Sequence, residues 1–181
     1  PGVHTMTRAK RQSSFTAFPP LPYVPVDMLF TGAAPAADYS AQIKVWTTYT
    51  QYLASAAGMV RVSDSIVHNS IKDPELYQKL HGAFKSVYDA LSGVDKEFIA
   101  GIQAMQQGKP PSYTFDPAPV PDWPDDPTKS GLFLAAWASI KPGLEVLLNK
   151  MPSGGAFATA IAGLLDAGDK CAADLEKAFS K

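Results

Sequence analysis

The residues able to carry out chemistry are few and widely spaced in this chain. Asp64 and His68 lie four positions apart, which places both on one face of a helix and makes them a legitimate pair of metal ligands. A zinc site needs three or four ligands, and no HExxH, CxxC or second histidine pair accompanies these two. A surface hydrogen bond or ion pair is therefore the preferred interpretation of the pair. His81, next to Gly82 and near an apolar stripe, is expected to be half-buried where helices pack.

Motifs for nucleophilic or cofactor chemistry are also missing. Cys171 lies in a predicted helix with no histidine nearby; Lys170 could lower the pKa of its thiol, but a small buried apolar role is preferred. No glutamate precedes a histidine by three, and GxSxG, P-loop and GxGxxG patterns do not occur. Gly154 and Gly155 are interpreted as a turn before a helix. The sequence predicts a non-enzymatic protein with no cofactor and no metal.

Composition and charge exclude several classes of protein. The 181 residues contain 16 basic and 17 acidic side chains, for a net charge of -1, so nucleic acid is a disfavoured partner. The single cysteine excludes an intrachain disulfide and favours a cytoplasmic or otherwise disulfide-free environment. No apolar run reaches the roughly 18 residues of a membrane span, and the basic cluster near the N-terminus is followed by polar residues and prolines, so no signal peptide is expected.

The remaining outlier is proline, with 16 residues gathered mainly in two segments. We expect residues 1–5 to be a tag remnant, with a processed mature terminus as the alternative. Residues 6–35 form a proline- and aromatic-rich extended arm, and residues 36–181 a single helical domain. Within that domain, residues 108–129 form a proline- and aspartate-rich strap that crosses the bundle, because a structureless connection of this length is unusual in a compact domain.

Apolar spacing predicts an all-α fold. Two long helices, residues 38–71 and 74–107, are joined so briefly that they must form an antiparallel hairpin. Asp73 is placed to cap the second helix and Pro74 to occupy its first position, while Asp95 is assigned to the polar outer face. Ser130 is expected to cap a helix from residue 132, which Pro142 ends or kinks, and a last helix covers residues 156–179, with a break at Gly168. The result resembles a four-helix bundle.

Two surfaces are candidates for binding another protein. Apolar arm residues can pack either on the chain's own core, which is the simpler interpretation, or on a neighbouring subunit. Three basic residues of the arm can pair with three strap aspartates, within one chain or between two. The interaction candidates are Phe15, Phe18, Leu21, Tyr23 and Phe30 for apolar docking, Arg8, Lys10 and Arg11 for the basic cluster, and Asp122, Trp123, Asp125 and Asp126 for the strap.

The function that follows is a structural or assembly subunit that acts through protein–protein contacts, its arm docking on a neighbouring subunit. A homo-oligomer or one heterologous protein partner fits this hypothesis. The first alternative is a monomeric adaptor or chaperone-like module for one protein partner. A lipid-surface-active amphipathic protein and a carrier of a small molecule in the bundle core are further alternatives.

Overall fold

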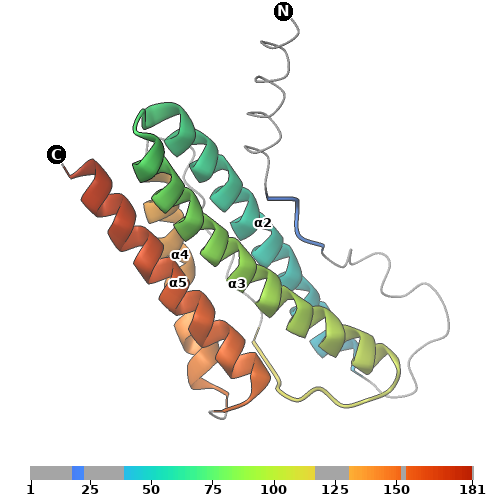
Figure 1. Cartoon of the computed structure of the whole chain (residues 1–181). Coiled ribbons are helices and arrows are strands. Elements are labelled where there is room, and N and C mark those ends of the chain that lie inside the picture. The colour runs from blue at the N-terminus through green and yellow to red at the C-terminus, as the bar shows by residue number, and fades with distance from the viewer. Residues whose placement is uncertain (1–17, 23–38, 117–130, 152–153, 181) are drawn as a thin grey trace, which may run out of the picture.

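The computed structural model describes residues 18–22, 39–116, 131–151 and 154–180. These residues form four helices and no strand: α2 (Ser40–Ser70), α3 (Pro74–Gln106), α4 (Gly131–Asn149) and α5 (Ala156–Phe179) (Figure 1). Helix α3 packs against α2 and α5, and α4 packs against α5 and α2, which closes the four helices into a bundle. The predicted all-α, bundle-like fold is confirmed.

The α2–α3 hairpin forms as its sequence predicts. The Asp73 side chain accepts a hydrogen bond from the backbone N–H of Glu75 at 3.1 Å, and Pro74 occupies the first turn. Both features stabilise a helix start, since the first N–H groups of a helix have no partner within it. Only residues 71–73 separate the two helices, so α3 must fold back along α2.

Helix α3 ends at one end of the bundle, and α4 begins towards the other (Figure 1). Towards the end of the bundle that holds the α2–α3 turn, Phe84 of α3 contacts Phe133 at the start of α4, with ring centroids 5.5 Å apart. At the other end of the bundle, Phe98 of α3 meets Phe157 at the start of α5, at 4.8 Å. Helix α4 therefore begins towards the end with the α2–α3 turn and runs in the same direction as α3 (Figure 1). Two helices of the same direction need a long crossover, which explains the length of the strap.

The first part of the strap is fixed to the bundle by side chains of α2. The Gln42 amide forms two hydrogen bonds with the backbone of Phe115: Nε2 donates to the carbonyl at 3.1 Å, and Oε1 accepts from the N–H at 2.9 Å. Tyr49 Oη donates to the carbonyl of Asp116, and the Phe115 ring is buried beside Trp46. Residues 117–130 lie outside the described residues, and with them Trp123, the three strap aspartates and the expected Ser130 cap.

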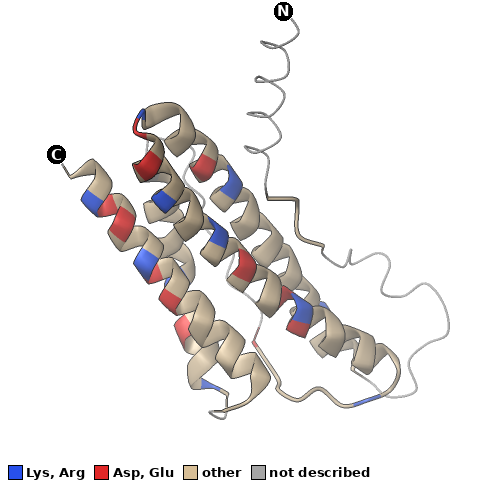
Figure 2. Ribbon diagram, viewed as in Figure 1, with Lys and Arg blue, Asp and Glu red and all other residues tan. Residues whose placement is uncertain are grey.

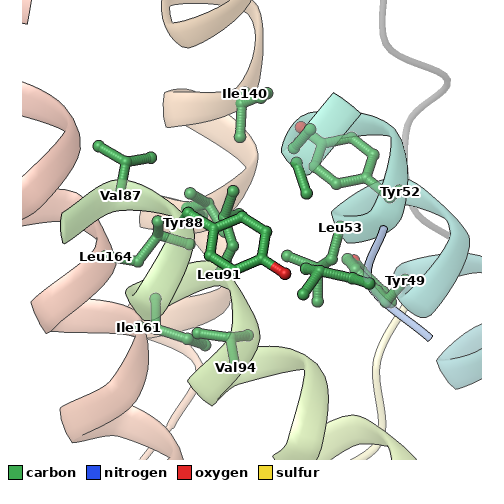
Figure 3. Close-up of a cluster of buried hydrophobic side chains, with 14 of the residues drawn as sticks. Tyr49, Tyr52, Leu53, Val87, Tyr88, Leu91, Val94, Ile140, Ile161 and Leu164 are labelled. Atoms are coloured by element: carbon green, nitrogen blue, oxygen red, sulfur yellow. The ribbon is translucent and has the colours of Figure 1, made fainter. Parts of the chain in front are cut away.

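The core is a continuous apolar interior contributed by all four helices. Figure 3 shows Leu53 of α2, Leu91 and Val94 of α3, and Ile161 and Leu164 of α5 converging at its centre. Each of these five side chains is at most 2% exposed. Outside the core, acidic and basic residues are intermixed along α3 and α5 in the view of Figure 2. None of the described helices combines the length and apolar character required to cross a bilayer.

Pro142, expected to end or kink its helix, does not end it, because α4 continues to Asn149. The break expected at Gly168 is wrong, because α5 continues through Gly168 and Asp169 to Phe179. Gly168 instead allows close packing, because a Cβ at this position would overlap the ring of Trp137. Asp169 fixes the same ring by accepting a hydrogen bond from Trp137 Nε1 at 2.9 Å. Gly168 and Asp169, which were expected to interrupt the helix, thus form the surface on which the Trp137 ring packs.

Gly101 allows Trp46 to pack closely in the same way. Gly93, eight residues earlier on α3, provides a matched control. A Cβ at Gly101 would overlap the Trp46 ring, whereas a Cβ at Gly93 would meet nothing within 4 Å. We expect Gly101→Ala to lower the free energy of unfolding by about 1–3 kcal/mol, because the ring must shift. Gly93→Ala should raise it by about 0.5–1 kcal/mol through helix propensity. Urea denaturation of the two variants checks the sign of each change, and a stabilising Gly101→Ala would contradict the packing described.

Candidate protein-interaction site

A short piece of the predicted arm is docked on the outside of the α2–α3 hairpin. We call residues 18–22 the arm segment. Phe18 and Leu21 are each 5% exposed, whereas Pro19, Pro20 and Pro22 are exposed. Two apolar anchors therefore face the bundle and three prolines face away from it. The described part of the arm packs on the chain's own helices, as the simpler interpretation of the sequence has it.

The Phe18 ring lies between two aromatic rings of α3. Its centroid is 5.2 Å from that of His81, with the planes at 19°, and 5.1 Å from that of Tyr88, with the planes at 22°. His81 and Tyr88 are seven residues apart, which separates them by about 10.5 Å along a helix axis. That separation is about twice a stacking distance, so a single aromatic ring fits between them.

The backbone of the arm segment is also recognised. Tyr88 Oη donates a hydrogen bond of 2.5 Å to the carbonyl of Pro19, and Arg61 Nη1 donates a longer one of 3.5 Å to the carbonyl of Phe18. Burial, and secondarily the negative charge of Asp89, raise the pKa of Tyr88. The phenol is therefore protonated at neutral pH and available as a donor.

Beneath the arm segment lies a polar cluster formed by the buried Asp64 and the half-buried Tyr77 and His81. Asp64 Oδ1 is 2.9 Å from His81 Nδ1, and Tyr77 Oη lies 3.5 Å from the same carboxylate oxygen and 3.3 Å from the imidazole nitrogen. Asp64 is only 2% exposed and His81 16%. Burial raises the pKa of Asp64, while the hydrogen bond and charge of His81 act in the opposite direction.

This cluster corrects the sequence-based interpretation of Asp64. Asp64 is buried instead of exposed, and its carboxylate pairs with His81 across the hairpin. His68 places its ring edge-on to Tyr77, with centroids 4.9 Å apart. The expectation of a partly buried His81 at the helix packing surface is confirmed.

The arrangement suits positioning better than bond-breaking chemistry. In the part of the chain that the structure describes, no serine, threonine or cysteine side chain hydrogen-bonds to His81, and no three metal-ligating side chains gather. A carboxylate on Nδ1 fixes the tautomer and the plane of an imidazole ring. Asp64 therefore holds the His81 ring in the plane against which Phe18 stacks.

An open groove of about 560 Å³ borders the arm segment. One wall is the arm itself, at Phe18, Pro19 and Pro20, and the other is the outer face of α2. Val62, on the α2 wall, is 45% exposed, which is unusual for a large apolar side chain in this structure. The arm segment thus leaves apolar surface uncovered beside it.

A second buried carboxylate lies further along α3. Asp95 is 1% exposed, and neither carboxylate oxygen has a hydrogen-bond partner among the described residues. Burial raises the pKa of Asp95 to about 7. The assignment of Asp95 to the polar outer face is therefore wrong. It lies seven residues beyond Tyr88, on the face of α3 whose His81 and Tyr88 receive the arm segment, a surface that we call the arm site.

Two other expectations concern the interior. Cys171 is fully buried, and burial raises the pKa of its thiol, so Lys170 does not activate it. The cavity enclosed by Val60, Leu91, Phe133 and their neighbours measures about 10 Å³. That volume is about what one water requires, so this part of the core has no room for a small-molecule cargo.

The sequence-predicted interaction residues separate into two groups. Phe18 and Leu21 are the two that the structure brings to the site. Those that lie outside the described residues are Phe15, Tyr23, Phe30, Arg8, Lys10, Arg11, Asp122, Trp123, Asp125 and Asp126, so the pairing of the basic arm with the acidic strap stays a prediction.

Sequence reasoning missed the receiving surface, formed by Arg61, Asp64, Tyr77, His81 and Tyr88. One signal was present: Asp64 lies seven residues before Ile71, and His81 seven residues after Pro74. In an antiparallel hairpin, residues equally far from the turn face one another. Comparison of the chain with family models, with curated proteins and with solved structures found no match.

Removing the Asp64 carboxylate should loosen both the hairpin and the arm. Asp64→Ala leaves His81 and Tyr77 without their shared acceptor, so we expect a loss of about 1–3 kcal/mol in the free energy of unfolding. Asp64→Asn keeps an acceptor oxygen and should cost less. Limited proteolysis within the first 35 residues should be faster in Asp64→Ala than in Asp64→Asn. Equal cleavage rates in both variants would mean that the acceptor at position 64 does not contribute to arm docking.

The buried Asp95 predicts a pH-dependent stability. Its folded-state pKa lies above the unfolded value, so ionisation opposes folding and stability falls as pH rises from about 4 to 7. At pH 8 we expect Asp95→Asn to be more stable than the wild type by about 2–4 kcal/mol, with little difference at pH 4. Denaturant unfolding at the two pH values measures this. Asp89→Asn, an exposed control on the same helix, should change stability by less than about 1 kcal/mol at either pH.

Proposed function

We propose that this chain is a non-enzymatic assembly subunit that acts through protein–protein contacts, its arm segment docking on a neighbouring copy. The observation that carries the proposal is the manner in which the arm segment binds its own bundle. Two buried anchors, two ring stacks and two hydrogen bonds to carbonyls attach a non-helical segment to the outside of a complete helical core. These are the contacts by which one protein binds an extended segment of another.

The length of the intervening chain supports docking between copies. Arg61 lies 21 residues along α2 from Ser40, or about 32 Å at the rise of an α-helix. Residues 23–39 link the arm segment to α2, and 17 residues can extend to about 56 Å. The link is longer than the distance it must cover within one chain. A second copy can therefore supply the same segment to the same surface, as in domain swapping.

The monomeric adaptor is the second candidate, and docking within one chain favours it. In that case the arm segment acts as a built-in competitor, which an external protein segment of similar chemistry displaces. Both candidates use the same surface. They differ in whether the incoming segment belongs to a second copy or to a different protein.

Light scattering after size exclusion, from low micromolar to near-millimolar concentration, tests self-assembly. Docking within one chain competes at an effective concentration in the millimolar range, so multimers should appear towards the upper end. We expect the wild-type mass to rise above 19.3 kDa with concentration. Phe18→Asp, which removes the anchor, should remain at 19.3 kDa.

Pro22→Asp is the matched control, because it introduces the same charge at an exposed position of the arm segment. This variant should assemble like the wild type. A wild-type mass that stays monomeric at every concentration would contradict assembly and leave the adaptor as the candidate function.

A further inference from the structure

We infer that Arg61, His81 and Tyr88 form a recognition site for an extended segment in which an aromatic residue is followed by two prolines and a leucine. The inference rests on the proposed function, in that it names the partner chemistry of the same surface. Residues 18–22, Phe-Pro-Pro-Leu-Pro, are its occupant here. The site recognises two features of that occupant: the ring of Phe18 and the carbonyls of Phe18 and Pro19.

The Phe18 ring is recognised by stacking between the rings of His81 and Tyr88. Both rings lie nearly parallel to Phe18, at 19° and 22°, so only a flat side chain fills the gap while stacking on both sides. Asp64 and Tyr77 hold the imidazole in this orientation from below. An aliphatic side chain at this position would leave one of the two ring faces uncovered.

The backbone of the segment is recognised through its carbonyls, which accept hydrogen bonds from side chains of the site. Tyr88 Oη and Arg61 Nη1 donate to two successive carbonyls of the segment. Pro19 and Pro20 are exposed and have no N–H, so the polar backbone groups through which they meet the site are carbonyls.

The prolines also reduce the entropic cost of binding. Their φ angles are fixed before binding, so less backbone freedom is lost when the segment docks. Leu21, three residues after Phe18, supplies the second buried anchor. A segment without prolines would thus bind less tightly, because it would lose more backbone freedom on docking.

A peptide supplied in trans tests the site. The probe is a fluorescein-labelled peptide of residues 14–24, and the receptor is the full chain carrying Phe18→Asp, whose own arm segment cannot dock. Fluorescence anisotropy should show saturable binding. The wild-type chain should bind the peptide about tenfold or more weakly, since its own arm segment competes at an effective concentration in the millimolar range.

Second-site variants in the Phe18→Asp chain assign the contacts. Tyr88→Phe keeps the ring but loses the donor, and should weaken binding about three- to tenfold, the usual effect of one hydrogen bond. His81→Ala removes one of the two rings between which the phenylalanine stacks, and should weaken peptide binding further. Tyr113→Phe, a tyrosine beside Phe157 at the other end of the bundle, should leave binding unchanged. Peptides with alanine at the position of Phe18 or of Pro19 should bind more weakly than the parent.

The outcomes separate this inference from the proposed function. Binding that follows this order in a chain that is monomeric at every concentration supports the site and removes assembly. A chain that assembles but binds no peptide, or binds parent and alanine peptides equally, overturns the site. Circular dichroism verifies that the receptor is folded, and Leu21→Asp replaces Phe18→Asp as receptor if it is not.

Discussion

The close antiparallel packing of α2 and α3 is the constraint on which the remaining structure depends. Three residues join two helices of 31 and 33 residues, so the turn sets the register along their whole length. That register places Asp64 against His81 near the turn, and Trp46 against Gly101 far from it. The arm site and the fixed strap are both consequences, because each is built on side chains that the hairpin brings together.

The opposite ends of the hairpin serve different purposes. At the end far from the turn, Trp46, Phe98, Phe115 and Phe157 form a buried aromatic cluster that joins α2, α3, the strap and α5. This cluster stabilises the crossover. Nearer the turn, aromatic rings face outward and receive the arm segment. One end thus completes the fold, and the other presents a surface.

Sequence patterns predict the parts of this structure that depend on local chemistry. The apolar spacing of α3, the Asp73 cap and the short connection determine a hairpin before any tertiary contact is considered. The break predicted at Gly168 is wrong because tertiary packing overrides helix propensity: a glycine is required where Trp137 approaches. Asp95 was misplaced for a related reason, since a charged residue is normally assigned to solvent, and its burial depends on neighbours that no spacing rule reveals. The arm site needed the pairing of Asp64 with His81, which follows from the register of the turn but not from either residue alone.

The energetics of the arm segment explain why its docking is separable from folding of the bundle. Burying Phe18 and Leu21 stabilises the docked state by about 1.5–3 kcal/mol each. Fixing the backbone of a residue costs about 1–2 kcal/mol, less at prolines, where φ is already restricted. These contributions nearly cancel, so docking is a balance of small free energies, whereas most of the buried core is contributed by the four helices themselves. A segment held in this way exchanges readily with an equivalent segment from outside, and the helical surface that receives it is already formed.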